Sequence, residues 1–177
     1  MDQNWIMEIS KQSQLEKLKK TNEFTKKYGL ILSEEDTELL VKNRIDSLKE
    51  QQRVEFGDSI LPKIIYEFCD SPYIYQSNYV EIMIRLQDTF YLYKNEMLDE
   101  ISDDELLHFM REQFDTVCHG DVEYLEGTCL DLFAQAIRAG YHGYKESAGY
   151  GEYAQFDLVP RWEKEVFLDA LKNLGLD

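Results

Sequence analysis

Apolar residues recur every three or four positions along most of the chain, which is the spacing of helices with one buried face. The longest such pattern predicts a helix over 77–98. Its expected buried stripe, spaced by alternate steps of four and three residues, comprises Tyr79, Met83, Leu86, Phe90, Tyr93 and Met97. The strict alternation of apolar and polar residues that predicts strands is nearly absent. The pattern therefore predicts an all-α fold, a single compact bundle of about six or seven helices.

Capping residues mark the ends of the first helices. The apolar spacing breaks near Thr21, which predicts two helical pieces within 1–27, and Gly29 is placed as a left-handed stop. Ser33 precedes three acidic residues and is expected to cap a helix that runs to about Glu55. The buried face of this helix is expected to contain Val41, Ile45 and Leu48.

Three further helices are predicted before the pattern changes. One begins near Asp58, because Pro62 is tolerated only in a first turn. Ser102 opens another as the first residue of a capping box with Glu105. Asp121 caps the third, which is expected to close at Gly140. The expected buried stripe of this third helix comprises Val122, Leu125, Cys129, Leu132 and Ala136.

A segment rich in glycine and tyrosine, Gly140–Phe156, follows and is predicted to be a long loop or a short hairpin before a last helix with Pro160 in its first turn. Charge divides the chain into a basic N-terminal helical segment, 1–28, and an acidic helical domain, 29–177. The length of 177 residues favours one domain overall.

The composition excludes several classes of protein. The net charge of −16 argues against nucleic-acid binding by direct phosphate contact. The longest stretch without Asp, Glu, Lys or Arg is Ser71–Val80, which is too short to span a membrane. The three cysteines, Cys69, Cys118 and Cys129, are an odd number without framework spacing, which is typical of reduced cytosolic thiols. We therefore expect a cytoplasmic protein.

Four segments of the sequence resemble one known family: TNEFTKKYGLILSEED, RVEFGDSILPKIIYEFCDSPYI, LQDTFYLYKNEMLDEISDDELLHFMREQFD and GDVEYLEGTCLDLFAQAIR. The chain from Thr21 to about Arg138 is similar to a family of Firmicutes proteins that carries only a domain-of-unknown-function label. The resemblance implies a bacterial, clostridial-type, cytoplasmic protein. It implies no reaction, cofactor or catalytic residue.

Metal-binding patterns are incomplete. Glu105 and His108 form a single E-x-x-H pair, whereas the di-iron carboxylate proteins use two such pairs, and Glu105 has an alternative role in the capping box. Cys118, His119 and Cys129, with His108, are sulfur and nitrogen ligands without the paired spacing of structural zinc sites. The alternative for the cysteines is burial in the core. No catalytic residue and no cofactor is expected.

Acidic residues gather in one region, Glu96–Asp131, which has twelve acidic residues and one basic residue. One interpretation is a solvated face that keeps the protein soluble. The other is a docking face for a basic protein partner, since complementary charge steers association and sets specificity. The residues expected to form this face are Asp99, Glu100, Asp103, Asp104, Glu112 and Asp115.

Twelve tyrosines are present, and two groups lie in predicted connections. Tyrosine offers a large contact area and a hydroxyl at low entropic cost, which favours it in binding surfaces. The candidate binding residues are Tyr73, Tyr75, Tyr141, His142, Tyr144, Tyr150 and Tyr153. The alternative is that these rings cover the ends of the bundle.

The leading functional hypothesis is a non-enzymatic protein-interaction module that uses the acidic face and the tyrosine loops. The basic segment 1–28 could pack on the acidic face in the same chain, as a removable cover, or in a second copy, which would make a homodimer. The rival hypothesis is an enzyme or small-molecule-binding protein with a pocket near Tyr141, His142, Tyr144 and Lys145. A metal site at Glu105 and His108 is a third hypothesis.

Overall fold

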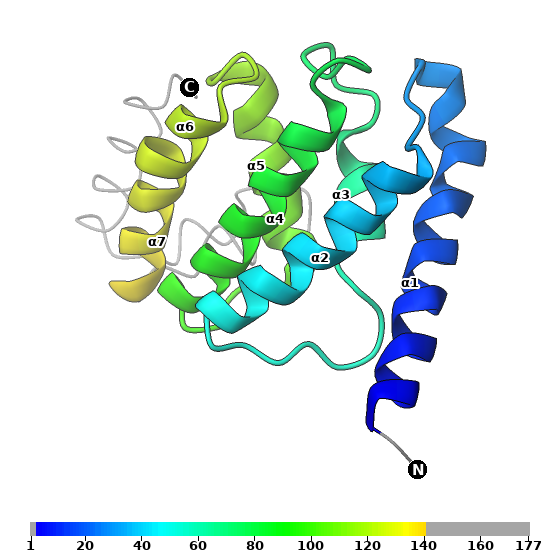
Figure 1. The fold of residues 1–177 in the computed structure, drawn as a ribbon. Coiled ribbons are helices and arrows are strands. Elements are labelled where there is room, and N and C mark those ends of the chain that lie inside the picture. The colour runs from blue at the N-terminus through cyan, green and yellow to red at the C-terminus, as the bar shows by residue number, and fades with distance from the viewer. Residues whose placement is uncertain (1–2, 141–177) are drawn as a thin grey trace. The chain divides into compact units, whose positions relative to one another are not determined.

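A computed structural model describes residues 3–140 of the chain, and these residues are helical with no strand among them (Figure 1). The all-α prediction is confirmed for this part. The helices are α1 (Gln3–Thr25), η1 (Lys26–Tyr28), α2 (Glu34–Glu50), α3 (Leu61–Phe68), α4 (Tyr79–Glu96), α5 (Asp103–Thr116), α6 (Val122–Tyr124), the π-helical η2 (Leu125–Leu130) and α7 (Asp131–Arg138). The predicted loop after Gly140 and the last helix lie outside the described residues.

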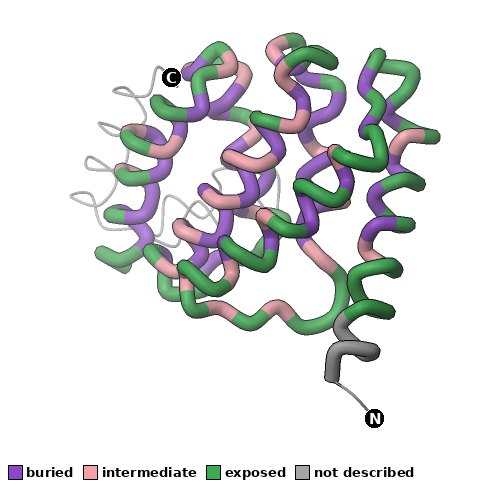
Figure 2. The backbone as a smooth tube through the Cα atoms, in the orientation of Figure 1, coloured by how far each residue is buried: buried purple, intermediate pink, exposed green. Residues whose placement is uncertain are grey.

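The chain divides into two compact units, Met1–Tyr91 and Leu92–Asp177. The division falls inside α4, so that most of this helix belongs to the first unit and its last residues belong to the second. In the first unit α1 packs against both α2 and α3. In the second unit α5 contacts the π-helical segment η2. Figure 2 shows that buried and exposed stretches alternate along the helices, as one-sided burial requires.

Helix α1 is continuous to Thr25, so the predicted break near Thr21 is wrong. The polar residues that interrupt the apolar spacing bind backbone groups instead of ending the helix. The Asn22 side chain accepts a hydrogen bond from Leu32 N at 2.8 Å and donates one to Leu32 O at 2.9 Å. Gly29, with φ of 79°, is the predicted left-handed stop. The break in the pattern therefore marks a tertiary contact of α1.

Helix α2 begins as predicted, with a complete capping box between Ser33 and Asp36. It ends at Glu50, five residues earlier than expected, because Gln52 adopts a left-handed φ of 54° and Glu55 turns inward. The predicted buried face is also wrong in part, since Ile45 is exposed. The residues of α2 that are buried are Thr37, Leu40, Val41, Arg44 and Ser47.

Helix α4 confirms the longest pattern, since every residue of the predicted stripe from Tyr79 to Met97 is buried. Pro62 lies in the first turn of α3, as its missing N–H requires. The Ser102 hydroxyl caps α5 by accepting a hydrogen bond from Glu105 N at 3.2 Å.

Residues 122–138 form one run of helix with a π-helical turn in its middle. The Asp121 carboxylate caps its start by accepting hydrogen bonds from Glu123 N and Tyr124 N. A π-turn holds an extra residue, which changes the positions that are buried after it. Phe133, and not the predicted Leu132, is buried, and its ring stacks on Phe109 with centroids 3.9 Å apart, while Ala136 is buried as predicted.

Candidate functional site

An exposed aromatic cluster lies in the first unit, where the end of α1 meets α3. The Phe24 ring makes edge contacts with Tyr28 and Tyr66, with centroids 6.0 and 5.4 Å apart. Lys27 Nζ lies 4.0 Å above the Phe24 ring centroid and 5.2 Å from that of Tyr28. Each of the three rings keeps between 42% and 47% of its surface exposed. We call Phe24, Lys27, Tyr28 and Tyr66 the aromatic cluster.

The cluster has a polar frame that fixes the neighbouring connections. The Gln76 side chain accepts a hydrogen bond from Ile31 N at 2.7 Å and donates one to Ile31 O at 2.8 Å, and this joins the segment after η1 to the α3–α4 connection. Ile31 itself keeps 45% of its surface exposed. The backbone between α1 and α2 is therefore held by side chains on both sides, at Asn22 and at Gln76.

Two of the sequence-predicted tyrosines lie in the α3–α4 connection. The Asn78 side chain accepts a hydrogen bond from Tyr75 N at 2.7 Å and donates one to Tyr73 O at 3.2 Å. Tyr75 is exposed and Tyr73 is half-buried. Their role as binding residues stays a prediction. The other candidates, Tyr141, His142, Tyr144, Tyr150 and Tyr153, lie outside the described residues.

The predicted acidic face lies in the second unit, and several of its carboxylates are paired. The buried amine of Lys94 lies 2.9 Å from Asp103 Oδ1 and 3.7 Å from Asp99 Oδ1, and it donates a hydrogen bond to Ile101 O at 2.7 Å. Arg111 pairs with Asp115 at 2.7 Å. Glu100, Asp104 and Glu112 are exposed. These internal cations reduce the negative potential that the sequence composition alone predicts.

The predicted metal ligands are spread out. Glu105 is half-buried and His108 is exposed on α5, and the described residues contain no group of three or more His, Cys, Asp or Glu side chains arranged to hold a metal ion. The structure does bring two of the zinc candidates together, since the Sγ atoms of Cys118 and Cys129 are 3.6 Å apart. Cys69 and Cys129 are buried, as predicted.

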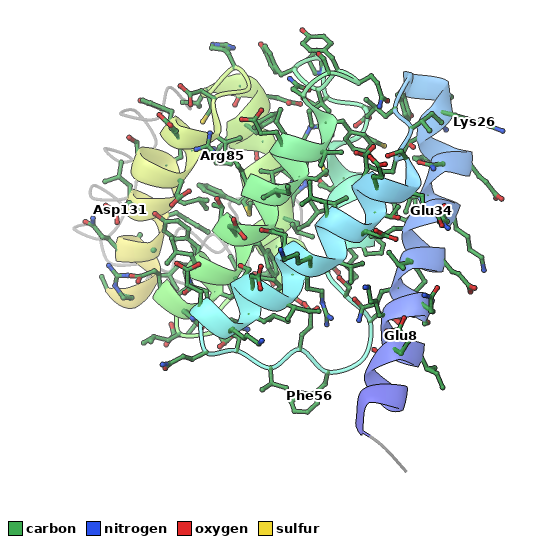
Figure 3. All side chains as sticks on the ribbon, viewed as in Figure 1. Glu8, Lys26, Glu34, Phe56, Arg85 and Asp131 are labelled. Atoms are coloured by element: carbon green, nitrogen blue, oxygen red, sulfur yellow. The ribbon has the colours of Figure 1, made fainter. Side chains whose placement is uncertain are left out.

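A buried polar group that sequence reasoning missed holds the α2–α3 connection. Arg44 Nε donates to Glu55 Oε1 at 2.7 Å, and the Tyr91 hydroxyl donates to Glu55 Oε2 at 2.8 Å. Burial and the adjacent Glu55 carboxylate raise the pKa of Tyr91. On either side of the inward-facing Glu55, Val54 and Phe56 are 73% and 89% exposed. Figure 3 shows Phe56 projecting from this connection, far from Lys26 next to the aromatic cluster.

A cavity of about 350 Å³ opens in the first unit between α1, α2 and the start of α3. It is lined by Ile9, Ser10, Ser13, Gln14, Lys17, Leu18, Val41, Gly57, Asp58, Ser59, Leu61 and Pro62. Lys17 and Asp58 form an ion pair in this lining. The Oε1 atom of Gln14 is buried there without a hydrogen-bond partner.

Within the described residues the chain is thus an all-α protein whose first unit has an exposed aromatic cluster and a small cavity. None of the described helices combines the length and the apolar character that a bilayer span needs.

The chain belongs to a family of unknown function, DUF6323, whose sequence model matches residues 17–143. The resemblance to a family without an assigned function is therefore confirmed, and the clostridial origin stays a prediction. No curated protein matches the chain, and no solved structure matches it.

Proposed function

We propose that this protein is a non-enzymatic interaction module that binds a protein partner through the aromatic cluster of its first unit. The observation that carries the proposal is the contact of one half-exposed ring, Phe24, with two others, Tyr28 and Tyr66. Rings in contact that remain open to solvent resemble the aromatic anchors at the centre of protein interfaces. The frame made by Asn22 and Gln76 supports this role, because preorganised surfaces lose less entropy on binding.

Charge around the cluster favours a partner segment that is acidic and partly apolar. Lys27 lies over two of the rings, and the neighbouring Lys20 and Lys26 are exposed. A carboxylate that approaches the rings would meet these ammonium groups, while an apolar side chain covers the ring faces. Glu23 is the one acidic residue among positions 20–28.

The acidic face of the second unit remains a second proposed contact surface, suited to a basic partner. Glu100, Asp104 and Glu112 support it by their exposure. Asp99 and Asp103 pair with Lys94, and Asp115 pairs with Arg111. We therefore rank the acidic face second to the aromatic cluster as a contact surface. The tyrosines beyond residue 140 stay part of the hypothesis without structural support.

A peptide array tests the proposal directly. Peptides of matched length and apolar content, one set acidic and one set basic, are incubated with the full-length protein, with Phe24→Ala/Tyr66→Ala and with Phe56→Ala. Phe56 is the matched control, since it is an exposed aromatic residue away from the cluster. Circular dichroism and urea unfolding of each variant verify the fold.

We expect acidic peptides to bind the natural protein and Phe56→Ala alike, and to bind the cluster variant at least about tenfold more weakly. Equal binding by the natural protein and the cluster variant would overturn the proposal. Preferential binding of basic peptides, lost on Glu100→Gln/Asp104→Asn, would assign the contact to the acidic face instead.

The cavity favours a second candidate function, the binding of a small polar molecule. A buried acceptor without a partner, Gln14 Oε1, suits a ligand that donates a hydrogen bond, and the volume of about 350 Å³ suits a small metabolite. The test is a thermal-shift screen of small polar metabolites against the natural protein and Gln14→Leu. A stabilising compound whose effect is lost in Gln14→Leu supports this function, and the absence of any shift contradicts it.

A further inference from the structure

Two cysteines that are 11 residues apart in the sequence meet in the interior of the second unit. The Sγ atoms of Cys118 and Cys129 lie 3.6 Å apart, within hydrogen-bond distance for thiols. Cys118 keeps 6% of its surface exposed and Cys129 keeps none. Cys118 therefore keeps a small opening to solvent, whereas Cys129 is enclosed, and the two sulfur atoms are adjacent.

The backbone on both sides of the pair departs from regular α-helix. Cys118 follows the end of α5 and precedes two left-handed residues, His119 with φ of 49° and Gly120 with φ of 87°. Cys129 lies in η2, where the π-helical turn replaces the ordinary hydrogen-bond ladder. Formation of a disulfide needs the two sulfurs to approach by about 1.5 Å, to the covalent S–S distance of about 2.05 Å. A turn and a π-segment can accommodate such a shift more readily than two regular helices can.

The hydrogen bond between the thiols also makes them chemically unequal. Either sulfur can be the donor of this bond. The bond to Cys129, burial and the Asp121 carboxylate raise the pKa of the Cys118 thiol, whereas the bond to Cys118 lowers the pKa of Cys129. Cys129 is therefore the thiol that more readily forms the thiolate, which is the nucleophilic form of cysteine. Cys118 stands at hydrogen-bond distance as the thiol that can react next.

We propose that Cys118 and Cys129 are a modification site at which hydrogen peroxide forms an intramolecular disulfide that low-molecular-weight thiols reduce again. In the first step a Cys129 thiolate attacks one peroxide oxygen, the O–O bond breaks, and the released hydroxide takes up a proton to become water. This leaves a sulfenic acid on Cys129. In the second step the Cys118 sulfur displaces the sulfenic oxygen, which leaves with the Cys118 proton as a second water. Two thiols thus lose two hydrogens and two electrons, and the peroxide gains them.

The disulfide would tie the turn after α5 to the helical run 122–138. Cross-linking two segments restricts the unfolded chain, so the oxidised protein should unfold at higher temperature than the reduced protein. Cys69 supplies the internal control, because it is also buried but follows the end of α3 in the first unit, where its Sγ contacts Tyr66 O at 3.7 Å.

The experiment treats the full-length, folded protein with hydrogen peroxide and then counts reactive thiols after denaturation. We expect three thiols before oxidation and one after it, together with a mass loss of about 2 Da for the two hydrogens removed. Peptide mapping should join the segments that contain Cys118 and Cys129. Cys69→Ser should behave like the natural protein, apart from its missing third thiol. Cys118→Ser should give no intramolecular link and should instead leave a sulfenic acid on Cys129, which dimedone traps when it is present as the protein is denatured.

A second measurement tests the proposal on the natural protein, so that its outcome does not depend on whether a variant folds. The same oxidation in concentrated urea should form the link far more slowly, because the folded chain is what holds the sulfurs 3.6 Å apart. Dithiothreitol should restore all three thiols of the folded protein. A link that includes Cys69, a link formed equally fast in urea, or three thiols that survive peroxide would each overturn the proposal.

Discussion

Arg44 and Glu55 form an ion pair in the interior of the first unit, with Arg44 Nε 2.7 Å from Glu55 Oε1 and side chains only 9% and 16% exposed. The pair joins α2 to a connection that has no regular structure of its own. Tyr91 completes the arrangement by donating a hydrogen bond to the second Glu55 oxygen. The inward turn of Glu55 is what places its neighbours Val54 and Phe56 in solvent.

This relationship predicts that Glu55→Gln is strongly destabilising. The amide keeps the shape of the carboxylate but leaves the Arg44 guanidinium buried without its counter-charge, which should cost about 2–3 kcal/mol of unfolding free energy. Urea unfolding measures the loss. Lys19→Gln is the control, because it breaks an exposed pair with Glu34 and should leave the unfolding midpoint almost unchanged. Equal stability of Glu55→Gln and the natural protein would contradict the prediction.

Buried tyrosines predict a loss of stability in alkali. Burial raises the pKa of Tyr93 to about 12, and it also raises the pKa values of Tyr79 and Tyr91. A tyrosine with a raised folded pKa binds its proton more tightly in the folded state than in the unfolded state, where the pKa is about 10. The stabilisation is complete below pH 10 and is lost progressively as the pH rises from there toward the folded pKa.

Urea midpoints measured between pH 8 and pH 11.5 test this prediction. The midpoint should be level up to about pH 10 and fall above it. Tyr93→Phe should reduce the slope of this fall, and Tyr75→Phe, at an exposed site, should not. A midpoint that is independent of pH across this range would contradict the assignment of these hydroxyls to the interior.

The helices themselves were largely predictable because capping and spacing are local properties. Ser33, Ser102 and Asp121 each cap the helix that the sequence assigned to them, and the stripe on α4 is buried throughout. These features need only neighbouring residues, since a cap satisfies amides within one turn and a stripe repeats every three or four positions.

The errors come from long-range contacts that no local pattern encodes. Asn22 breaks the apolar spacing because it binds Leu32, and Glu55 leaves the helical pattern because Arg44 and Tyr91 draw it inward. The π-turn at η2, for which the composition gives no signal, moved the buried position from Leu132 to Phe133.

The candidate site was predicted less well than the fold. The binding role expected for Tyr73 and Tyr75 stays a prediction, whereas the cluster joins Phe24 and Tyr28 to Tyr66 of α3, across about 40 residues of sequence. The charge count overstated the negative charge of the acidic face, because the amine of Lys94, a residue of α4, pairs with Asp99 and Asp103.

The α4–α5 connection offers a stabilising substitution. Leu98 is 68% exposed and adopts a left-handed φ of 54°, a conformation that costs an ordinary residue roughly 1–2 kcal/mol. Leu98→Gly should relieve this strain. Glycine also raises the conformational entropy of the unfolded chain, which offsets part of the gain, so the net stabilisation should be about 0.5–1 kcal/mol. Thermal unfolding measures the gain.

The matched control is Leu39→Gly, at an exposed leucine inside α2 with helical backbone. Here glycine relieves no strain and should destabilise the protein by about 1 kcal/mol. If both Leu98→Gly and Leu39→Gly are destabilised, the strain assigned to Leu98 is contradicted. Opposite changes in stability at two exposed leucines would show that the effect comes from the backbone.

Lys94 leads to a last prediction, which concerns the second unit alone. Its amine is buried, donates a hydrogen bond to the Ile101 carbonyl, and forms ion pairs with the carboxylates of Asp103 and Asp99. Lys94→Met keeps the length of the side chain but removes the donor and the charge, so that a buried carbonyl loses its partner and two carboxylates repel each other. We expect a loss of about 2–3 kcal/mol in unfolding free energy.

Arg138→Met is the matched control for this change. Arg138 also bridges to α4, with Nη1 3.0 Å from both Glu96 O and Glu96 Oε2, but both side chains are more than one third exposed. Water can replace these bonds, so the variant should lose less than about 1 kcal/mol. Added salt separates the two contributions of Lys94, because it screens the repulsion between Asp99 and Asp103 but does not restore the donor to Ile101. Full recovery of Lys94→Met in high salt would show that the carbonyl contact contributes nothing, contrary to the burial of the amine.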